Sequence, residues 1–167
     1  FIKTIETLME KGYAYVSDGN VYFDLKNVTI RNGFYCGNRN NYNVAGNVTL
    51  VLKEGVTTDN VYAGSRTAGN VGGTVTVVAD GIDLTQTNIY GKPKSGTGTI
   101  GGLALVLKQG QLADVSEDFI TRDGVSVELC CAQTKTAVLP YDINLELNGN
   151  SITCSGSGNV VGKDSAT

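Results

Sequence analysis

The sequence contains no histidine and no tryptophan. The absence of histidine excludes Ser-His-Asp and Cys-His nucleophilic catalysis, histidine general bases and histidine-ligated metal sites. Any catalysis must therefore rest on carboxylate, lysine, arginine or tyrosine side chains. We expect neither a metal site nor a cofactor.

The chain also has little charge, with 17% charged residues and a net charge of −3. Nucleic-acid-binding proteins usually present a basic face, so this weakly acidic balance argues against a nucleic-acid partner. The sequence lacks any run of 18 apolar residues. We therefore expect no membrane span.

The four cysteines have neither zinc-site spacing nor a histidine partner. A disulfide, such as one between Cys131 and Cys154, is one interpretation. The favoured interpretation is that the cysteines are small apolar residues in or near the core. The four are Cys36, Cys130, Cys131 and Cys154.

The chain has only two prolines but 22 glycines, which fits many tight turns between short strands. The sequence also repeats about every 27 residues, with copies that begin at Gly19, Gly46 and Gly73 and a fourth at Leu103. A fixed period of this length, built from strand-forming residues and glycine turns, is typical of a stacked solenoid.

Each copy contains three apolar residues at alternating positions, which predicts one side of a strand. The first members of successive triplets are 27, 27, 28, 22 and 18 residues apart. If the strands stack in register, these triplets form the core. The six triplets are Val21/Phe23/Leu25, Val48/Leu50/Leu52, Val75/Val77/Ala79, Leu103/Leu105/Leu107, Val125/Val127/Leu129 and Ile143/Leu145/Leu147.

The predicted fold is all-β: one parallel β-helix domain of about six coils over residues 1–167. Residues 1–12 have helical amphipathicity and are expected to cap the stack. Residues 19–110 form the regular coils, and residues 111–167 form shorter coils and an open C-terminal end. An antiparallel roll or sandwich is the alternative, because periodicity does not fix strand direction.

Two segments support this fold by resemblance. Residues 47–64 and 73–91, with alternating Val-Thr strands and Asn-Val-Tyr or Asn-Ile-Tyr before a glycine, resemble repeats of bacterial surface proteins. Residues 143–153, Ile-Asn-Leu-Glu-Leu-Asn-Gly-Asn-Ser-Ile-Thr, resemble a turn of right-handed β-helix domains in bacterial adhesins and polysaccharide-processing enzymes. This resemblance implies an adhesin-like bacterial protein that is secreted or displayed on the cell surface.

Residues 5–25, which include Leu-Met-Glu-Lys-Gly-Tyr-Ala-Tyr, are similar to a segment of cysteinyl-tRNA synthetases. The ATP-binding signature and the zinc site of that family both need histidine. Because this chain has no histidine, aminoacylation does not carry over to it.

One repeat position holds a tyrosine in three copies, and a cation follows each tyrosine. Stacked copies would align phenol rings with positive charges. Aromatic faces stack on sugars, while arginine and lysine pair with carboxylate or sulfate groups, so an acidic polysaccharide would fit. The alternative is that the tyrosines only stack on one another and close the turns, with solvated cations beyond them. The predicted ligand-binding residues are Tyr35, Tyr62, Tyr90, Arg39, Arg66, Lys92 and Lys94.

The residues that alternate with the apolar triplets predict a second row of equivalent residues on the outward side of the same strands. Three valines in this row would form an apolar stripe, which another chain, a folded-back loop or self-association could cover. The alternative is that these positions only reflect the preference of β-branched residues for strands. Two glutamates on adjacent strands could repel each other, bind a cation or, in a cleft, act as a glycosidase pair. We expect no cleft beside them and no catalytic residue. The row consists of Asp24, Val51, Val78, Val106, Glu128 and Glu146.

These features lead to three hypotheses, of which we favour the first. The protein is a non-enzymatic surface or secreted module that binds a polysaccharide or a surface protein along the solenoid. Alternatively, it is part of a carboxylate-dependent polysaccharide lyase or hydrolase. The third hypothesis is a structural spacer within a longer repeat protein.

Overall fold

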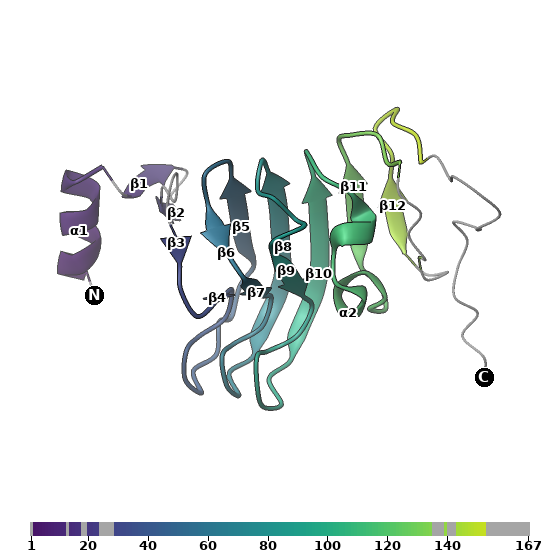
Figure 1. The fold of residues 1–167 in the computed structure, drawn as a ribbon. Coiled ribbons are helices and arrows are strands. Elements are labelled where there is room, and N and C mark those ends of the chain that lie inside the picture. The colour runs from purple at the N-terminus through teal and green to yellow at the C-terminus, as the bar shows by residue number, and fades with distance from the viewer. Residues whose placement is uncertain are drawn as a thin grey trace.

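The computed structural model describes residues 2–12, 14–17, 20–23, 29–134, 139 and 143–152. Most of its elements are strands, as predicted for an all-β chain (Figure 1). The helices are α1 Ile2–Glu10, the 3₁₀ turn η1 Leu112–Asp114 and α2 Glu117–Ile120. The strands are β1 Ala14–Ser17, β2 Asn20–Phe23, β3 Thr29–Ile30, β4 Phe34–Tyr35, β5 Val48–Lys53, β6 Thr57–Thr58, β7 Asn60–Tyr62, β8 Val71–Asp80, β9 Asn88–Tyr90, β10 Ile100–Leu107, β11 Ser126–Leu129 and β12 Asn144–Glu146.

The largest sheet has five strands in the order β12-β11-β10-β8-β5, and every neighbouring pair is parallel. The predicted register is confirmed: Val48 pairs with Val75, Val75 pairs with Leu103, and the offsets in β11 and β12 follow the shorter spacings. The antiparallel roll or sandwich is therefore wrong for this sheet. Each strand lies beside the next copy of itself.

The alternating pattern of each strand separates core residues from outward residues. Leu52 and Val77 are fully buried, and Leu105 and Val127 are 1% exposed. Residues that alternate with these core residues along the strands, such as Val78, are only half-buried. One face of the sheet therefore forms the core.

A second set of short strands closes the other side of this core. Strands β4, β7 and β9 form a three-stranded parallel sheet, and β3 pairs with β6 in parallel. Val61 on β7 and Ile89 on β9 are fully buried in the same cluster as Leu52 of the large sheet. The second repeat, for example, thus contributes β5, β6 and β7 to three different sheets.

The first repeat differs from the prediction. Strand β2 pairs antiparallel with β1, with Val21 opposite Val16, so Val21 and Phe23 do not extend the large sheet beyond β5. Two residues, Asp18 and Gly19, separate β1 from β2, and Asp-Gly is a preferred sequence for a two-residue hairpin. This local pairing replaces the expected stacking.

The predicted N-terminal helix is present as α1, which packs against β1. Gly12 follows it with a φ of 73°, and the Gly12 N–H donates to the Met9 carbonyl at 3.0 Å. Glycine ends helices in this way because it adopts positive φ without strain. Figure 1 shows α1 beyond β1 and β2, at the N-terminal end of the molecule.

The connection from β10 to β11 contains η1 and α2, which the sequence analysis did not predict. Strand β9 is the main neighbour of α2. Phe119 of α2 is fully buried and is among the largest fully buried side chains. In this repeat α2 packs beside β9, where the preceding repeats have a strand.

Some predictions fall outside the described residues: Asp24, Leu25, Cys154 and the C-terminal end at residues 153–167. Among the other cysteines, Cys36 is buried in the core, Cys131 is half-buried and Cys130 is exposed, and all three are free thiols. Burial raises the pKa of the Cys36 thiol to about 12, as expected for a cysteine that acts as a small apolar residue.

Candidate functional site

The three predicted tyrosines stack on one another at the ends of β4, β7 and β9. The ring centres of Tyr35 and Tyr62 are 5.5 Å apart, and those of Tyr62 and Tyr90 are 5.0 Å apart. The ring planes in these pairs differ by only 10° and 17°. The in-register pairing of the strands places the tyrosines at equivalent positions and so produces this stack.

Stacking covers the aromatic faces. Both faces of Tyr62 contact neighbouring rings, and the Lys92 ammonium lies 5.5 Å from the centre of the Tyr90 ring. The Tyr35 hydroxyl donates to the Asn32 carbonyl at 2.7 Å. The stack therefore offers ring edges and hydroxyl groups more than open faces.

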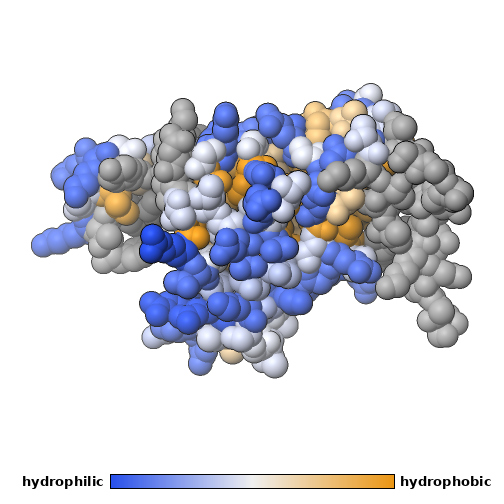
Figure 2. Space-filling model, in the orientation of Figure 1, coloured by the Kyte–Doolittle hydropathy of each residue, from blue (hydrophilic) through white to orange (hydrophobic). Residues whose placement is uncertain are grey.

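Three long loops follow the tyrosines and project together from one side of the molecule (Figure 1). They are residues 36–47, 63–70 and 91–99. In Figure 2 the surface over this projecting region is strongly hydrophilic. The loops contain four cations and no acidic residue.

Backbone hydrogen bonds fix the register of these loops. The Arg66 N–H donates to the Asn38 carbonyl at 3.0 Å, and the Lys94 N–H donates to the Ser65 carbonyl at 3.1 Å. In both bonds the donor is the N–H of a cationic residue. The acceptor is the carbonyl of the residue that directly precedes the equivalent cation in the preceding repeat. Arg39, Arg66 and Lys94 therefore occupy one position in three successive repeats, and we call them the cation file.

All three side chains of the cation file are exposed. None has an ion-pair or hydrogen-bond partner among the residues that the structure describes. Like charges at equivalent positions on neighbouring strands repel each other. A negatively charged ligand would offset this repulsion.

Lys92 does not belong to the cation file, although sequence analysis grouped it with the other cations. Its ammonium forms an ion pair with Asp118 at 3.2 Å while lying over the Tyr90 ring. Asp118 is on α2, which sequence analysis did not identify, so this neutralisation was not foreseen. Lys92 holds α2 against the stacked loops.

The backbone and polar side chains hold the loops together. The Asn38 N–H donates to Ser65 Oγ at 3.0 Å, and the Asn70 N–H donates to Asn43 Oδ1 at 3.0 Å. One repeat further, the Thr99 N–H donates to Asn70 Oδ1 at 2.9 Å. These contacts between repeats order the region that carries the cation file.

The outward face of the large sheet has the predicted row of valines. Val51 pairs with Val78 and Val78 with Val106, and all three are half-buried. The stripe is present, and self-association through it stays a prediction.

Beside the valine stripe, Asp80 at the end of β8 lies between Lys53 at the end of β5 and Lys108 just after β10. Its Oδ2 atom is 3.3 Å from both Lys108 Nζ and Lys53 Nζ. The hydrogen bond from Lys108, and after it that from Lys53, lowers the pKa of Asp80. These ion pairs link the C-terminal ends of β5, β8 and β10.

We expect Asp80→Asn to reduce stability at neutral pH by at most about 1 kcal/mol, as for other exposed ion pairs. A carboxylate with a lowered folded-state pKa stabilises the protein above its unfolded-state pKa and loses that effect as pH falls through the folded-state pKa. Urea unfolding at pH 7 and pH 3 should therefore show a smaller difference between the variant and the wild type at pH 3. An unchanged difference would mean that Asp80 does not titrate with the ion pairs.

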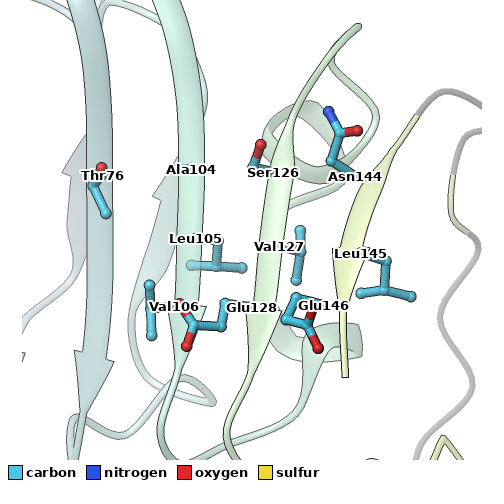
Figure 3. A pocket seen from close by; sticks show the side chains of 10 residues that line it. All are labelled: Thr76, Ala104, Leu105, Val106, Ser126, Val127, Glu128, Asn144, Leu145 and Glu146. Atoms are coloured by element: carbon cyan, nitrogen blue, oxygen red, sulfur yellow. The ribbon is translucent and has the colours of Figure 1, made fainter. Parts of the chain in front are cut away.

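Glu128 and Glu146 pair in register on β11 and β12. With Val106 they lie at one end of a shallow depression of about 530 Å³ on the outward sheet face, and Ser126 and Asn144 lie toward its other end (Figure 3). From the sequence we expected no cleft beside these glutamates, and the depression corrects that expectation. The depression forms because the side chains of Ala104 and Ser126 are short and leave space above β10 and β11 on the outward face.

Both glutamates accept hydrogen bonds from Asn148. Its side-chain amide donates to Glu128 Oε1 at 3.0 Å, and its backbone N–H donates to Glu146 Oε1 at 2.9 Å. Among the residues that the structure describes, no three cysteine or acidic side chains form a group that could hold a metal ion. The turn after β12 thus fixes the two carboxylates.

Comparisons with family models, with curated proteins and with solved structures gave no match for this chain. Within the described part of the chain, no helix is both long enough and apolar enough to cross a membrane. A functional proposal must therefore rest on the geometry of the surfaces described above.

Proposed function

We propose that the protein is a β-solenoid module that binds an acidic polysaccharide through the cation file, at the cell surface of a bacterium or after secretion. The parallel, in-register sheets and the offsets of 27 and 28 residues between equivalent contacts support a coiled architecture. Its localisation follows from the resemblance to surface-protein repeats.

The observation that carries the binding proposal is the lack of counter-charge around the cation file. Arg39, Arg66 and Lys94 are exposed, share one repeat position and have no acidic neighbour within their loops. Lys92, by contrast, already has Asp118 as its partner. Arginine and lysine pair readily with carboxylate and sulfate groups.

The tyrosine stack supports an acidic rather than a neutral glycan. A neutral sugar is commonly bound on an open aromatic face. In this protein both faces of Tyr62 and one face of Tyr90 are in contact with other groups. Charge, and not stacking, is therefore the main source of affinity.

The double variant Arg39→Gln/Lys94→Gln should bind acidic polysaccharides about 5- to 25-fold more weakly than the wild type, because each exposed ion pair contributes up to about 1 kcal/mol. The measurement is isothermal titration calorimetry with polygalacturonate at low ionic strength, where charge interactions are least screened. A neutral glucan should bind neither protein.

The matched control is Lys3→Gln/Lys11→Gln, which makes the same change in net charge at exposed positions in and just after α1. It should leave polygalacturonate binding unchanged. Equal losses in both double variants would show that only net charge matters, and the absence of wild-type binding to any acidic glycan would contradict the proposal.

A carboxylate-dependent polysaccharide hydrolase or lyase is the second candidate, supported by Glu128 and Glu146 lining one depression. This candidate predicts that prolonged incubation shortens a polysaccharide and that Glu146→Gln abolishes the shortening. Reducing-end and unsaturated-product assays on wild type and variant test it. A protein that neither binds nor cleaves glycans would fit the spacer hypothesis.

A further inference from the structure

We propose that the cation file is a three-charge site that selects acidic polysaccharides by the spacing of their charges. The inference rests on the proposed function and adds the class of glycan, namely one with an acid group on every sugar rather than on every second sugar.

The spacing of the file comes from the stacking of the repeats. Neighbouring parallel strands lie about 4.8 Å apart, so the backbones of Arg39, Arg66 and Lys94 are separated by about one strand spacing at each step. A pyranose unit lengthens a polysaccharide by a similar distance. A glycan that lies along the file therefore brings one sugar to each cation.

The file has three members because both of its ends are defined. Arg39 belongs to the first copy of the repeat, which begins at Gly19, so no earlier copy supplies a further cation. At the other end, α2 packs on the loop that carries Lys94: a Cβ on Gly91 would lie 2.8 Å from the Asp118 carbonyl oxygen and 2.9 Å from Phe119 Cα.

The backbone of the file is ordered before a ligand arrives. The Arg66 carbonyl accepts hydrogen bonds from the Ser95 N–H at 3.1 Å and the Ser95 hydroxyl at 2.8 Å. The Thr67 hydroxyl donates to the Arg39 carbonyl at 3.3 Å. The backbone positions that set the spacing of the file are therefore fixed, and binding has to order only the cationic side chains.

Two probes with equal charge test this inference. Trigalacturonate carries three carboxylates on three consecutive sugars, and a hyaluronan hexasaccharide carries three carboxylates on every second sugar. The first can engage all three cations, whereas the second matches only Arg39 and Lys94, which are two repeats apart. Calorimetry at one fixed low ionic strength should show trigalacturonate binding about fivefold more tightly, the effect of one exposed ion pair.

The variant Arg66→Gln removes the middle charge and supplies the sharper test. It should weaken trigalacturonate binding to about the level of the hexasaccharide and weaken hexasaccharide binding clearly less. The exposed control Lys3→Gln should change neither affinity. Because Arg66 is exposed, its replacement leaves the core intact, which circular dichroism can verify.

Equal wild-type affinities for the two probes would overturn the spacing inference, and so would an equal loss for both in Arg66→Gln. Either result leaves the proposed function standing, because acidic glycans still bind. If neither probe nor polygalacturonate binds the wild type, the proposed function itself fails.

Discussion

Replacing Val77 with aspartate should destabilise the protein by about 4 kcal/mol or more at pH 7, whereas the same change at Val78 should cost about 1 kcal/mol. Val77 is fully buried between the sheets, and its neighbour in the sequence is half-buried on the outward face. Burial can raise the pKa of a carboxyl by three units or more, and each unit corresponds to 1.36 kcal/mol. An aspartate on the outward face stays hydrated, and its main cost is that aspartate has a lower β-strand propensity than valine.

Urea unfolding followed by circular dichroism measures both variants. The Val77→Asp variant should recover part of its stability as pH falls toward 4, because the buried carboxyl is then neutral and no charge has to be buried. Similar losses in the two variants would contradict the assignment of inward and outward faces in β8.

Replacing Phe119 with alanine should destabilise the protein by about 3–5 kcal/mol and lower its Tm by on the order of 10 °C. Phe119 is fully buried, and α2 has only four residues. So short a helix has little stability of its own and depends on packing. Loss of the ring should therefore also loosen the Asp118–Lys92 ion pair.

Tyr42→Ala is the control for Phe119→Ala, because it removes an aromatic side chain that is 71% exposed. Its effect should lie within about 0.5 kcal/mol. Differential scanning calorimetry compares the two variants with the wild type. A Phe119→Ala variant as stable as the control would mean that α2 does not close this side of the core.

The sequence was sufficient to predict the register of the large sheet. Leu50, Val77 and Leu105 alternate with outward residues and recur at the repeat spacing, so only one alignment puts all of them inside. The same periodicity gave the equivalence of Tyr35, Tyr62 and Tyr90.

Other features depend on contacts between segments that the periodicity of the sequence does not predict. Val21 and Phe23 show the same alternation as later triplets, yet β2 pairs with β1 across a short hairpin. Helix α2 is too short for a helical period to be recognised in the sequence. Because the sequence did not predict α2, it also did not predict that Lys92 forms an ion pair with Asp118 and so leaves the cation file.

The in-register pairing of β5, β8 and β10 restricts how the gene for this protein can change in length. An insertion of one residue within β8 would exchange its inward and outward side chains beyond that point. A tandem duplication of residues 46–72 would instead preserve the pairing and add one strand to each of three sheets, together with a copy of Tyr62 and a copy of Arg66. Evolution by whole repeats would therefore lengthen the core and the charged surface in equal steps.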